Sequence, residues 1–463
     1  MNKGILSKSL SVLLVMFIVF TAVSISPSSA LLMSLTELQE DTFEPPIEVN
    51  VKHVTAGADH SLAVCSYGVL WAWGVNYSGE LGNGTQVSSA IPLSVMYNVA
   101  FSSAYYSSMS ITSDGVLYTW GANWGGQLGD GSLIARYTPQ RVLDNVRYVS
   151  VGATHTMAIR ADESLWAWGN NDFGQLGNNS YDAALIPIQI MENIAHVSAG
   201  ATHTLAITSA GVLYAWGHNN SGQLGDGTFT NRNSAVRVKD NVTQISAGFM
   251  YSLAVCANNG LWAWGDNGFG QLGDGTLENR STPVNIMDNV DHISTGTWII
   301  ASAVSTTGNL YIWGGYEPAA LVTDIEPVFS GSLTPQRLMG GVSTVSMGAE
   351  HALIICINGN LWAWGNNWFG QLGDGTAVNT TTPILIMQST GGSIAVNDPV
   401  DEIVIPDASQ VSLPHYTLSD YEYSQTEAQS ASLSPMTIAL IIFAAVMLLL
   451  MILLLRLYFR IKT

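Results

Sequence analysis

The sequence predicts an all-β, seven-bladed β-propeller, and three observations lead to this fold class. A Trp-Gly pair recurs seven times at a spacing of about 48 residues, at 73–74, 120–121, 168–169, 216–217, 264–265, 313–314 and 364–365. The chain is rich in Gly (45 of 463 residues) and Trp (14) but only 11% charged, which is typical of short strands joined by tight turns. A repeat period of about 40–50 residues indicates small β units that bury their faces by stacking around an axis.

The N-terminal residues 1–30 are predicted to be a secretory signal peptide. They combine a basic start at Lys3 and Lys8, an apolar run over 10–23 and small residues at 28–30. An uncleaved N-terminal anchor is the alternative.

Each repeat is predicted to hold three or four short antiparallel strands. In the fourth copy, 196–198, 204–207 and 213–216 fit strands, and the Gly-rich loop that follows reverses the chain. In another copy, 282–286 supplies a fourth strand, with Pro283 at its start.

The seven copies are expected to occupy 51–388, after a lead-in over 31–50. We expect Val51–Ala56 to complete the last blade by pairing with Pro383–Met387, because an open ring would leave two long strand edges.

The C-terminal region is predicted to be a stalk, a transmembrane helix and a short tail. Residues 389–435 are acidic and Ser-rich and contain no Lys or Arg, which favours an extended segment. Residues 436–455 are apolar and uncharged, and as a helix they are long enough to cross a bilayer. Because the tail 456–463 is basic, the positive-inside tendency places it in the cytoplasm and the propeller outside the cell membrane.

Two repeated motifs, Trp-Gly-x-Asn-x-x-Gly-Gln-Leu-Gly-Asp-Gly and Gly-x-x-His-[Ser/Thr]-[Leu/Met]-Ala, resemble the regulator-of-chromosome-condensation (RCC1-type) repeat. The resemblance covers about 340 residues. It implies a seven-bladed propeller, and it implies less about function because one fold hosts many activities.

Several repeated residues are expected to be structural. His60, His155, His203 and His351 lie 13 residues before a Trp in different blades, so we expect them to bond to a neighbouring turn rather than to meet at a metal. The remaining copies carry Ser107, Tyr251 and either Ile299 or Ile300 there. The Trp of each Trp-Gly pair is assigned the same structural role: Trp73, Trp120, Trp168, Trp216, Trp264, Trp313 and Trp364.

The cysteines and the loop aspartates are also expected to lack a metal or redox role. Cys65, Cys256 and Cys356 occupy one position in separate blades, which argues against a disulfide framework, with Cys65–Cys356 the pair to check. Loop carboxylates occur singly, as turn residues do, and not at the spacing of calcium ligands. We therefore expect no metal, no cofactor and no catalytic residues. The loop carboxylates are Asp130, Asp226, Asp274 and Asp374.

Aromatic residues in the Gly-rich loops are the candidate binding surface. They are expected to share one loop position, just before Gly-Gln-Leu-Gly, and so to gather on one face of the propeller. Exposed there, they would form a recognition surface; folded back, they would seal the blade junctions. They are Tyr77, Trp124, Phe173, Phe269, Trp368 and Phe369.

The sixth copy lacks Gly-Gln-Leu-Gly and carries an irregular insert instead. A special contact could lie in such a loop, and drift of a surface loop explains it equally well. Its candidate residues are Tyr316, Glu317, Asp324 and Glu326.

The formal net charge of −19 argues against nucleic-acid binding. The leading hypothesis is a non-catalytic, cell-surface protein-interaction module that presents loops to an extracellular protein or glycan. An alternative is a loop-binding inhibitor of an extracellular enzyme, as in secreted relatives that block β-lactamases. A third is nucleotide exchange on a Ran-type GTPase, as in the family namesake, which an exported and membrane-anchored domain would not reach.

Overall fold

The computed structural model describes residues 47–315 and 331–389. Every regular element within these ranges is a β-strand, and none of the described residues belongs to a helix that could span a membrane. The predicted signal peptide, stalk, membrane helix and tail lie outside the described residues.

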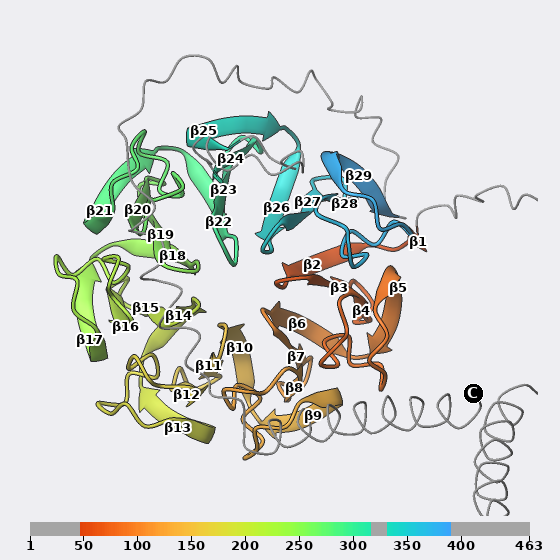
Figure 1. Cartoon of the computed structure of the whole chain (residues 1–463), viewed down its shortest axis with the longest axis horizontal. Helices are drawn as coiled ribbons and strands as arrows, with labels where there is room; N and C mark the ends of the chain where they lie inside the picture. Colours follow the sequence, from red (N-terminus) through yellow and green to blue (C-terminus); the bar gives the residue numbers. More distant parts are fainter. Residues whose placement is uncertain (1–46, 316–330, 390–463) are drawn as a thin grey trace, which may run out of the picture. The chain divides into compact units, whose positions relative to one another are not determined.

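The strands form seven sheets, and the four antiparallel strands of each are one blade of a propeller arranged around a central axis (Figure 1). Blades 1 to 4 comprise β2 (Val51–Ala56), β3 (His60–Cys65), β4 (Leu70–Gly74) and β5 (Ser89–Met96); β6 (Val99–Ala104), β7 (Ser107–Thr112), β8 (Leu117–Gly121) and β9 (Arg136–Leu143); β10 (Val146–Val151), β11 (His155–Arg160), β12 (Leu165–Gly169) and β13 (Ala184–Met191); β14 (Ile194–Ala199), β15 (His203–Thr208), β16 (Leu213–Gly217) and β17 (Arg232–Lys239).

The remaining blades repeat this order of four strands. Blades 5 to 7 comprise β18 (Val242–Ala247), β19 (Tyr251–Cys256), β20 (Leu261–Gly265) and β21 (Arg280–Met287); β22 (Val290–Thr295), β23 (Ile300–Ser305), β24 (Leu310–Gly314) and β25 (Ser332–Met339); β26 (Val342–Met347), β27 (His351–Cys356), β28 (Leu361–Gly365) and β29 (Thr380–Gln388). The all-β seven-bladed propeller is thus confirmed.

The ring closes differently from the sequence-based expectation. Val51–Ala56 is not the closing strand, because it forms β2, the innermost strand of blade 1. A separate two-residue strand, β1 (Ile47–Glu48), pairs in parallel with β29, with Ile47 opposite Met387 and Glu48 opposite Gln388 (Figure 1). The expected pairing with Pro383–Met387 is therefore wrong in its strand, although the N-terminal chain does cover the outer edge of blade 7.

The position of a strand within its blade explains its composition. The second strand of each blade is covered on both faces, so most of its residues are small or apolar, and in β3 every residue is buried. The outermost strand is an edge, and it tolerates a proline that donates no ladder bond. Pro283 lies inside β21 rather than at its start, and the edge position of β21 explains why it is accommodated.

The hydrophobic core lies between neighbouring blades rather than within one sheet. In one cluster Met157 and Leu176 of blade 3 pack with Val197 and Trp216 of blade 4. The same arrangement recurs around the ring, and a repeat unit therefore becomes stable only against its neighbours. The three cysteines are buried and free, so neither Cys65 nor Cys356 forms a disulfide.

Candidate functional site

The two ends of the blades differ, because the long loops all lie at one end. The register pairs Gly74 with both His60 and Ser89. The β2–β3 loop at 57–59 and the β4–β5 loop at 75–88 are therefore on the same side of blade 1. We call this side, with its equivalents in the other blades, the loop face. The opposite side carries only the short turns and is called the turn face.

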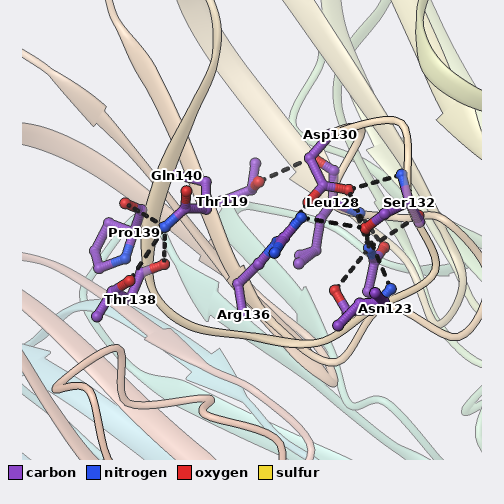
Figure 2. Close-up of polar contacts among 10 residues, drawn as sticks. Thr119, Asn123, Leu128, Asp130, Ser132, Arg136, Thr138, Pro139 and Gln140 are labelled. Carbon is purple, nitrogen blue, oxygen red and sulfur yellow. Dashed lines mark hydrogen bonds and ion pairs between the residues drawn. The ribbon is translucent and has the colours of Figure 1, made fainter.

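A buried asparagine organises the long loop in six of the blades, at positions 76, 123, 171, 219, 267 and 367. Asn123 is almost fully buried, and its Nδ2 donates to the carbonyl oxygens of Ser132 (3.0 Å) and Ile134 (3.1 Å). Its Oδ1 accepts a hydrogen bond from the Leu128 amide at 3.0 Å (Figure 2). Each of these loops is thus tied together from inside, and it presents its outward side chains from a rigid frame.

The loop aspartates are used by their own turns. Asp130 accepts hydrogen bonds from the Ser132 amide (3.0 Å) and hydroxyl (2.8 Å) and from Arg136 Nε (2.6 Å), as Figure 2 shows. Burial opposes ionisation of Asp130, but these donors together hold its pKa below the ordinary value. Asp226 and Asp274 pair with Arg232 and Arg280 in the same way. Across 47–315 and 331–389, no group of three or more His, Cys, Asp or Glu is placed to hold a metal.

The repeated histidines join one blade to the next. Thr204 Oγ1 lies 2.9 Å from His155 Nε2 and donates to the Gln175 carbonyl at 2.8 Å. Since the hydroxyl proton goes to Gln175, the imidazole must donate through Nε2–H. The indole of Trp216 donates to the same carbonyl at 2.9 Å. We call this group, an imidazole and a carbonyl of one blade with a hydroxyl and an indole of the next, the interblade latch.

The latch recurs at four junctions. Its imidazole–hydroxyl pairs are His60–Ser108, His155–Thr204, His203–Ser252 and His351–Ser61. Burial lowers the pKa of His60 to about 4 and of the other three imidazoles to about 3, so they are neutral near pH 7. The histidines are structural, but their partner is a strand hydroxyl of the next blade and not a neighbouring turn.

The rest of the repeat motif packs against the same junctions. The leucine of each Gly-Gln-Leu-Gly is fully buried, and so is the tryptophan of the Trp-Gly pair in the first six copies. The glycine after that leucine lies so close to the next blade that a Cβ at Gly82 would stand 2.6 Å from Trp120 Nε1. The motif residues are therefore taken up by blade packing, and recognition must depend on other side chains.

The candidate aromatic residues occupy two adjacent loop positions, so the expectation of one shared position is wrong. The residue after the buried asparagine points to solvent: Tyr77, Trp124 and Trp368 are 63%, 55% and 56% exposed. The next residue is half-buried and packs against its surroundings, as for Phe173, Phe269 and Phe369. The first of the two positions is thus available to a partner, whereas the second packs against the protein itself.

The structure adds exposed aromatic residues that sequence reasoning missed. Tyr106, Phe249 and Trp298 stand on the short loops between the first and second strands of blades 2, 5 and 6. Phe229 is exposed on the long loop of blade 4. Tyr106, Phe249 and Trp298 each lie where the sequence departs from the Gly-Ala-x-His pattern. That departure is the signal that could have identified them.

Exposed aromatic side chains are concentrated on the loop face. Among the described residues, the turn face exposes Tyr67, Tyr97 and Ile357 as its large apolar side chains. They lie on separate turns. On the loop face, in contrast, Tyr106 and Trp124 contact each other with ring centroids 5.4 Å apart, and Tyr77 contacts Phe369 at 5.9 Å.

The central channel is obstructed at the loop face. Tyr105 takes the position at which the other six blades carry Gly57, Gly152, Gly200, Gly248, Gly296 and Gly348. Its hydroxyl donates to the Thr297 carbonyl of blade 6 at 2.9 Å, so the side chain reaches from blade 2 to a blade that is not its neighbour. The Tyr105 side chain therefore occupies part of the space around the axis at the loop face. The sixth-blade candidates Tyr316, Glu317, Asp324 and Glu326 lie outside the described residues.

Comparisons with known proteins agree with this architecture. The family model described as RCC1-like domain matches residues 33–296, and models of the regulator of chromosome condensation (RCC1) repeat match 342–371 and 358–396. Human WBSCR16 is similar in structure, with 21% identity and a TM-score of 0.60, over 69% of this chain and 94% of that one. Prp20p from Saccharomyces cerevisiae, studied for its binding to Gsp1p and histones, has 20% identity and a TM-score of 0.59, over 73% and 88%. At such identities the likeness is one of fold.

Proposed function

Because the chain belongs to the RCC1-like domain family, we propose that it is a non-catalytic protein-interaction module whose loop face binds the partner. The observation that carries this proposal is the exposure of Tyr77, Trp124 and Trp368 on loops that buried asparagines hold rigid. Aromatic side chains anchored on a pre-ordered surface bury a large area on binding at a small entropy cost.

The Ser–His pairs of the propeller do not support catalysis. His60 Nε2 lies 2.7 Å from Ser108 Oγ, which is the distance of a base from its nucleophile. However, both residues are buried, and the Ser108 hydroxyl donates to the Glu80 carbonyl at 2.6 Å. The hydroxyl is thus committed to the interblade latch, and a substrate has no access to it.

Photo-crosslinking tests the loop face directly. A benzophenone amino acid is placed at 77, 124 or 368 in the full chain, and the matched controls carry it at 67, 97 or 357 on the turn face. We expect discrete protein adducts in cells from the loop-face positions alone. Adducts of equal yield from both faces, or none from either, would refute the proposal.

We further propose that the propeller is displayed outside the cell by a C-terminal membrane helix over 436–455. The apolar run and the basic residues after it support this orientation. Protease treatment of intact cells that express the chain with a tag after Thr463 is the test. Release of the propeller with protection of the tag is expected, and survival of the propeller until lysis would contradict it.

A further inference from the structure

One part of the loop face differs from the rest in charge. Blades 7 and 1 meet there, and the adjoining loops of blade 2 extend the same surface. Between residues 53 and 135, and again between 338 and 389, the sequence contains no Lys or Arg. Lys52, at the start of β2, lies at the turn-face end of that strand. Among the described residues of this part of the loop face, the one basic side chain is Arg136 at the end of the long loop of blade 2, and it pairs with Asp130 of the same loop.

Exposed aromatic residues and carboxylates share this surface. We call it the acidic aromatic sector and define it by Asp59, Tyr77, Tyr106, Trp124, Glu350 and Trp368. Tyr106 and Trp124 are in ring contact, and Asn366 joins Glu350 to Trp368: its Nδ2 donates to Glu350 Oε2 at 2.9 Å, and its Oδ1 accepts the Trp368 amide at 3.0 Å.

Backbone hydrogen bonds place the loop of Asp59 between the two ends of the sector. The Ala58 amide donates to the Tyr105 carbonyl at 2.8 Å, and the Ala349 amide donates to the Ala58 carbonyl at 3.3 Å. Burial, and next the charge of Glu350, raise the pKa of Asp59. Burial and then the charge of Asp59 raise the pKa of Tyr106. The three side chains are thus close enough to influence one another, and the two carboxylates repel.

The contrast with other loops makes this charge informative. Asp130, Asp226 and Asp274 each form an ion pair with an arginine of their own loop. Asp59 and Glu350 form no ion pair within the described part of the chain. Asp130, Asp226 and Asp274 are thus compensated within their own loops, whereas Asp59 and Glu350 of the acidic aromatic sector have no such counter-charge and remain available to another molecule.

We propose that the acidic aromatic sector binds a lysine- or arginine-bearing segment of the partner protein. An ammonium or guanidinium group can stand over the Tyr106 and Trp124 rings while it pairs with Asp59 and Glu350. A planar guanidinium satisfies both demands at once, so arginine is the preferred side chain. This inference rests on the proposed binding function and specifies the chemistry of the partner.

Peptide binding to the full chain is the test, measured by fluorescence anisotropy. The probe is a fluorescein-labelled Gly-Ser peptide with several spaced arginines, compared with the same peptide carrying glutamines. We expect the arginine peptide to bind and the glutamine peptide to bind at least about tenfold more weakly, as the loss of charge-assisted hydrogen bonds predicts.

The variants separate a specific sector from general negative charge. Asp59→Asn with Glu350→Gln should weaken binding about tenfold, and Trp124→Ala should weaken it about as much. The control Asp172→Asn with Asp182→Asn changes the net charge equally on the loop face of blade 3 and should leave the affinity within about twofold. Glu350→Gln alone keeps the acceptor for Asn366, and it serves if the double variant does not fold.

Two outcomes overturn the proposal. Equal weakening by the sector variants and by the blade 3 control would show attraction to net charge alone. Equal binding of the arginine and glutamine peptides would show that the cation is not recognised. Adducts in the crosslinking experiment together with either outcome would leave the interaction module in place with a partner of another chemistry.

Discussion

The junction between blades 3 and 4 and the junction between blades 6 and 7 solve the same packing problem with different chemistry. The first holds the buried pair His155 and Thr204. At the second, Ile300 stands in the histidine position and Ala352 in the hydroxyl position, beside a small cavity that Met347 and Trp364 also line. At this junction the imidazole and the hydroxyl are replaced together, as expected for two groups that bond to each other.

The junction between blades 5 and 6 supports the same conclusion. Tyr251 takes the histidine position there and donates to the Ile300 carbonyl at 2.6 Å, while Ala301 replaces the hydroxyl. Between blades 2 and 3, Thr156 remains without an imidazole, because its Oγ1 still donates to the Gln127 carbonyl. Thr156 thus keeps an acceptor, whereas the buried Ser107 hydroxyl, which takes the histidine position there, has no hydrogen-bond partner among the described residues. The apolar pair at the junction of blades 6 and 7 avoids such an unpaired group.

Among the changes that test this comparison of junctions, acidification should alter the free energy of unfolding most. The unfolded state binds a proton at each imidazole below pH 6.5, whereas the folded latch does so only at about pH 3–4. The free energy of unfolding is therefore undiminished above pH 6.5 and falls below it, by about 1.4 kcal/mol per imidazole per pH unit. The raised pKa values of Asp59 and Glu80 offset part of this loss.

Urea unfolding at pH 7.5, 5.5 and 4.5 measures this loss. Amide exchange should show the four latch junctions opening before the junction of blades 6 and 7. Stability that stays constant between pH 7.5 and 4.5 would contradict the neutral, buried imidazoles.

Truncation of the junction tryptophan should have the second largest effect, and it should be the same at both kinds of junction. Both tryptophans are fully buried. Trp216 donates to the Gln175 carbonyl at a junction with a latch imidazole, and Trp313 donates to the Gln271 carbonyl at a junction without one. We expect Trp216→Ala and Trp313→Ala each to lower the free energy of unfolding by about 3–5 kcal/mol. A large difference between the two variants in urea titrations would mean that the latch, not the indole, carries the junction.

A double-mutant cycle at His155 and Thr204 tests the latch itself. Thr204→Ala leaves the buried Nε2–H without an acceptor and should cost about 1–3 kcal/mol. His155→Leu together with Thr204→Ala should cost less than the sum of the single changes by about 1 kcal/mol, because the pair becomes apolar as in blades 6 and 7. Purely additive values would show that the two side chains act independently.

Construction of a fifth latch should have the smallest effect. Ile300→His with Ala352→Ser introduces both partners at once and should raise the free energy of unfolding by about 1 kcal/mol or less. Ile300→His alone buries an imidazole opposite Ala352 and should lower the melting temperature. If the single and double variants melt alike, the added hydroxyl does not reach the imidazole.

The blades could be predicted because their cause is periodic. Each Trp-Gly marks one unit, and the unit must stack to bury its faces, so repetition determines the architecture. The closing strand could not be predicted on this basis, because Ile47–Glu48 is two residues long and has no counterpart in the repeat. The contact between His155 and Thr204 joins residues that lie one repeat apart. The repeat period contains this separation but does not show that the two side chains meet.

The candidate surface was predictable only in part. Tyr77, Trp124 and Trp368 were identified because they sit beside a repeated motif, whereas Phe249 and Trp298 interrupt one. The direction of the backbone after the buried asparagine decides which of two neighbouring loop side chains faces solvent. The spacing of residues in the sequence does not show that direction. The carboxylates of the acidic aromatic sector come from blades that adjoin only after the ring closes.

The β1–β29 pair has a consequence for the biosynthesis of the protein. Ile47 and Met387 are separated by roughly 340 residues, so the ribosome must finish the last blade before the first strand finds its partner. At about 5–20 residues per second this interval lasts roughly 20–70 s. During that time the nascent chain can form an arc of joined blades, each held by its predecessor, whose two ends remain unprotected. Because of the order of translation, the closing strand β1 therefore remains without its partner β29 during almost the whole synthesis of the chain.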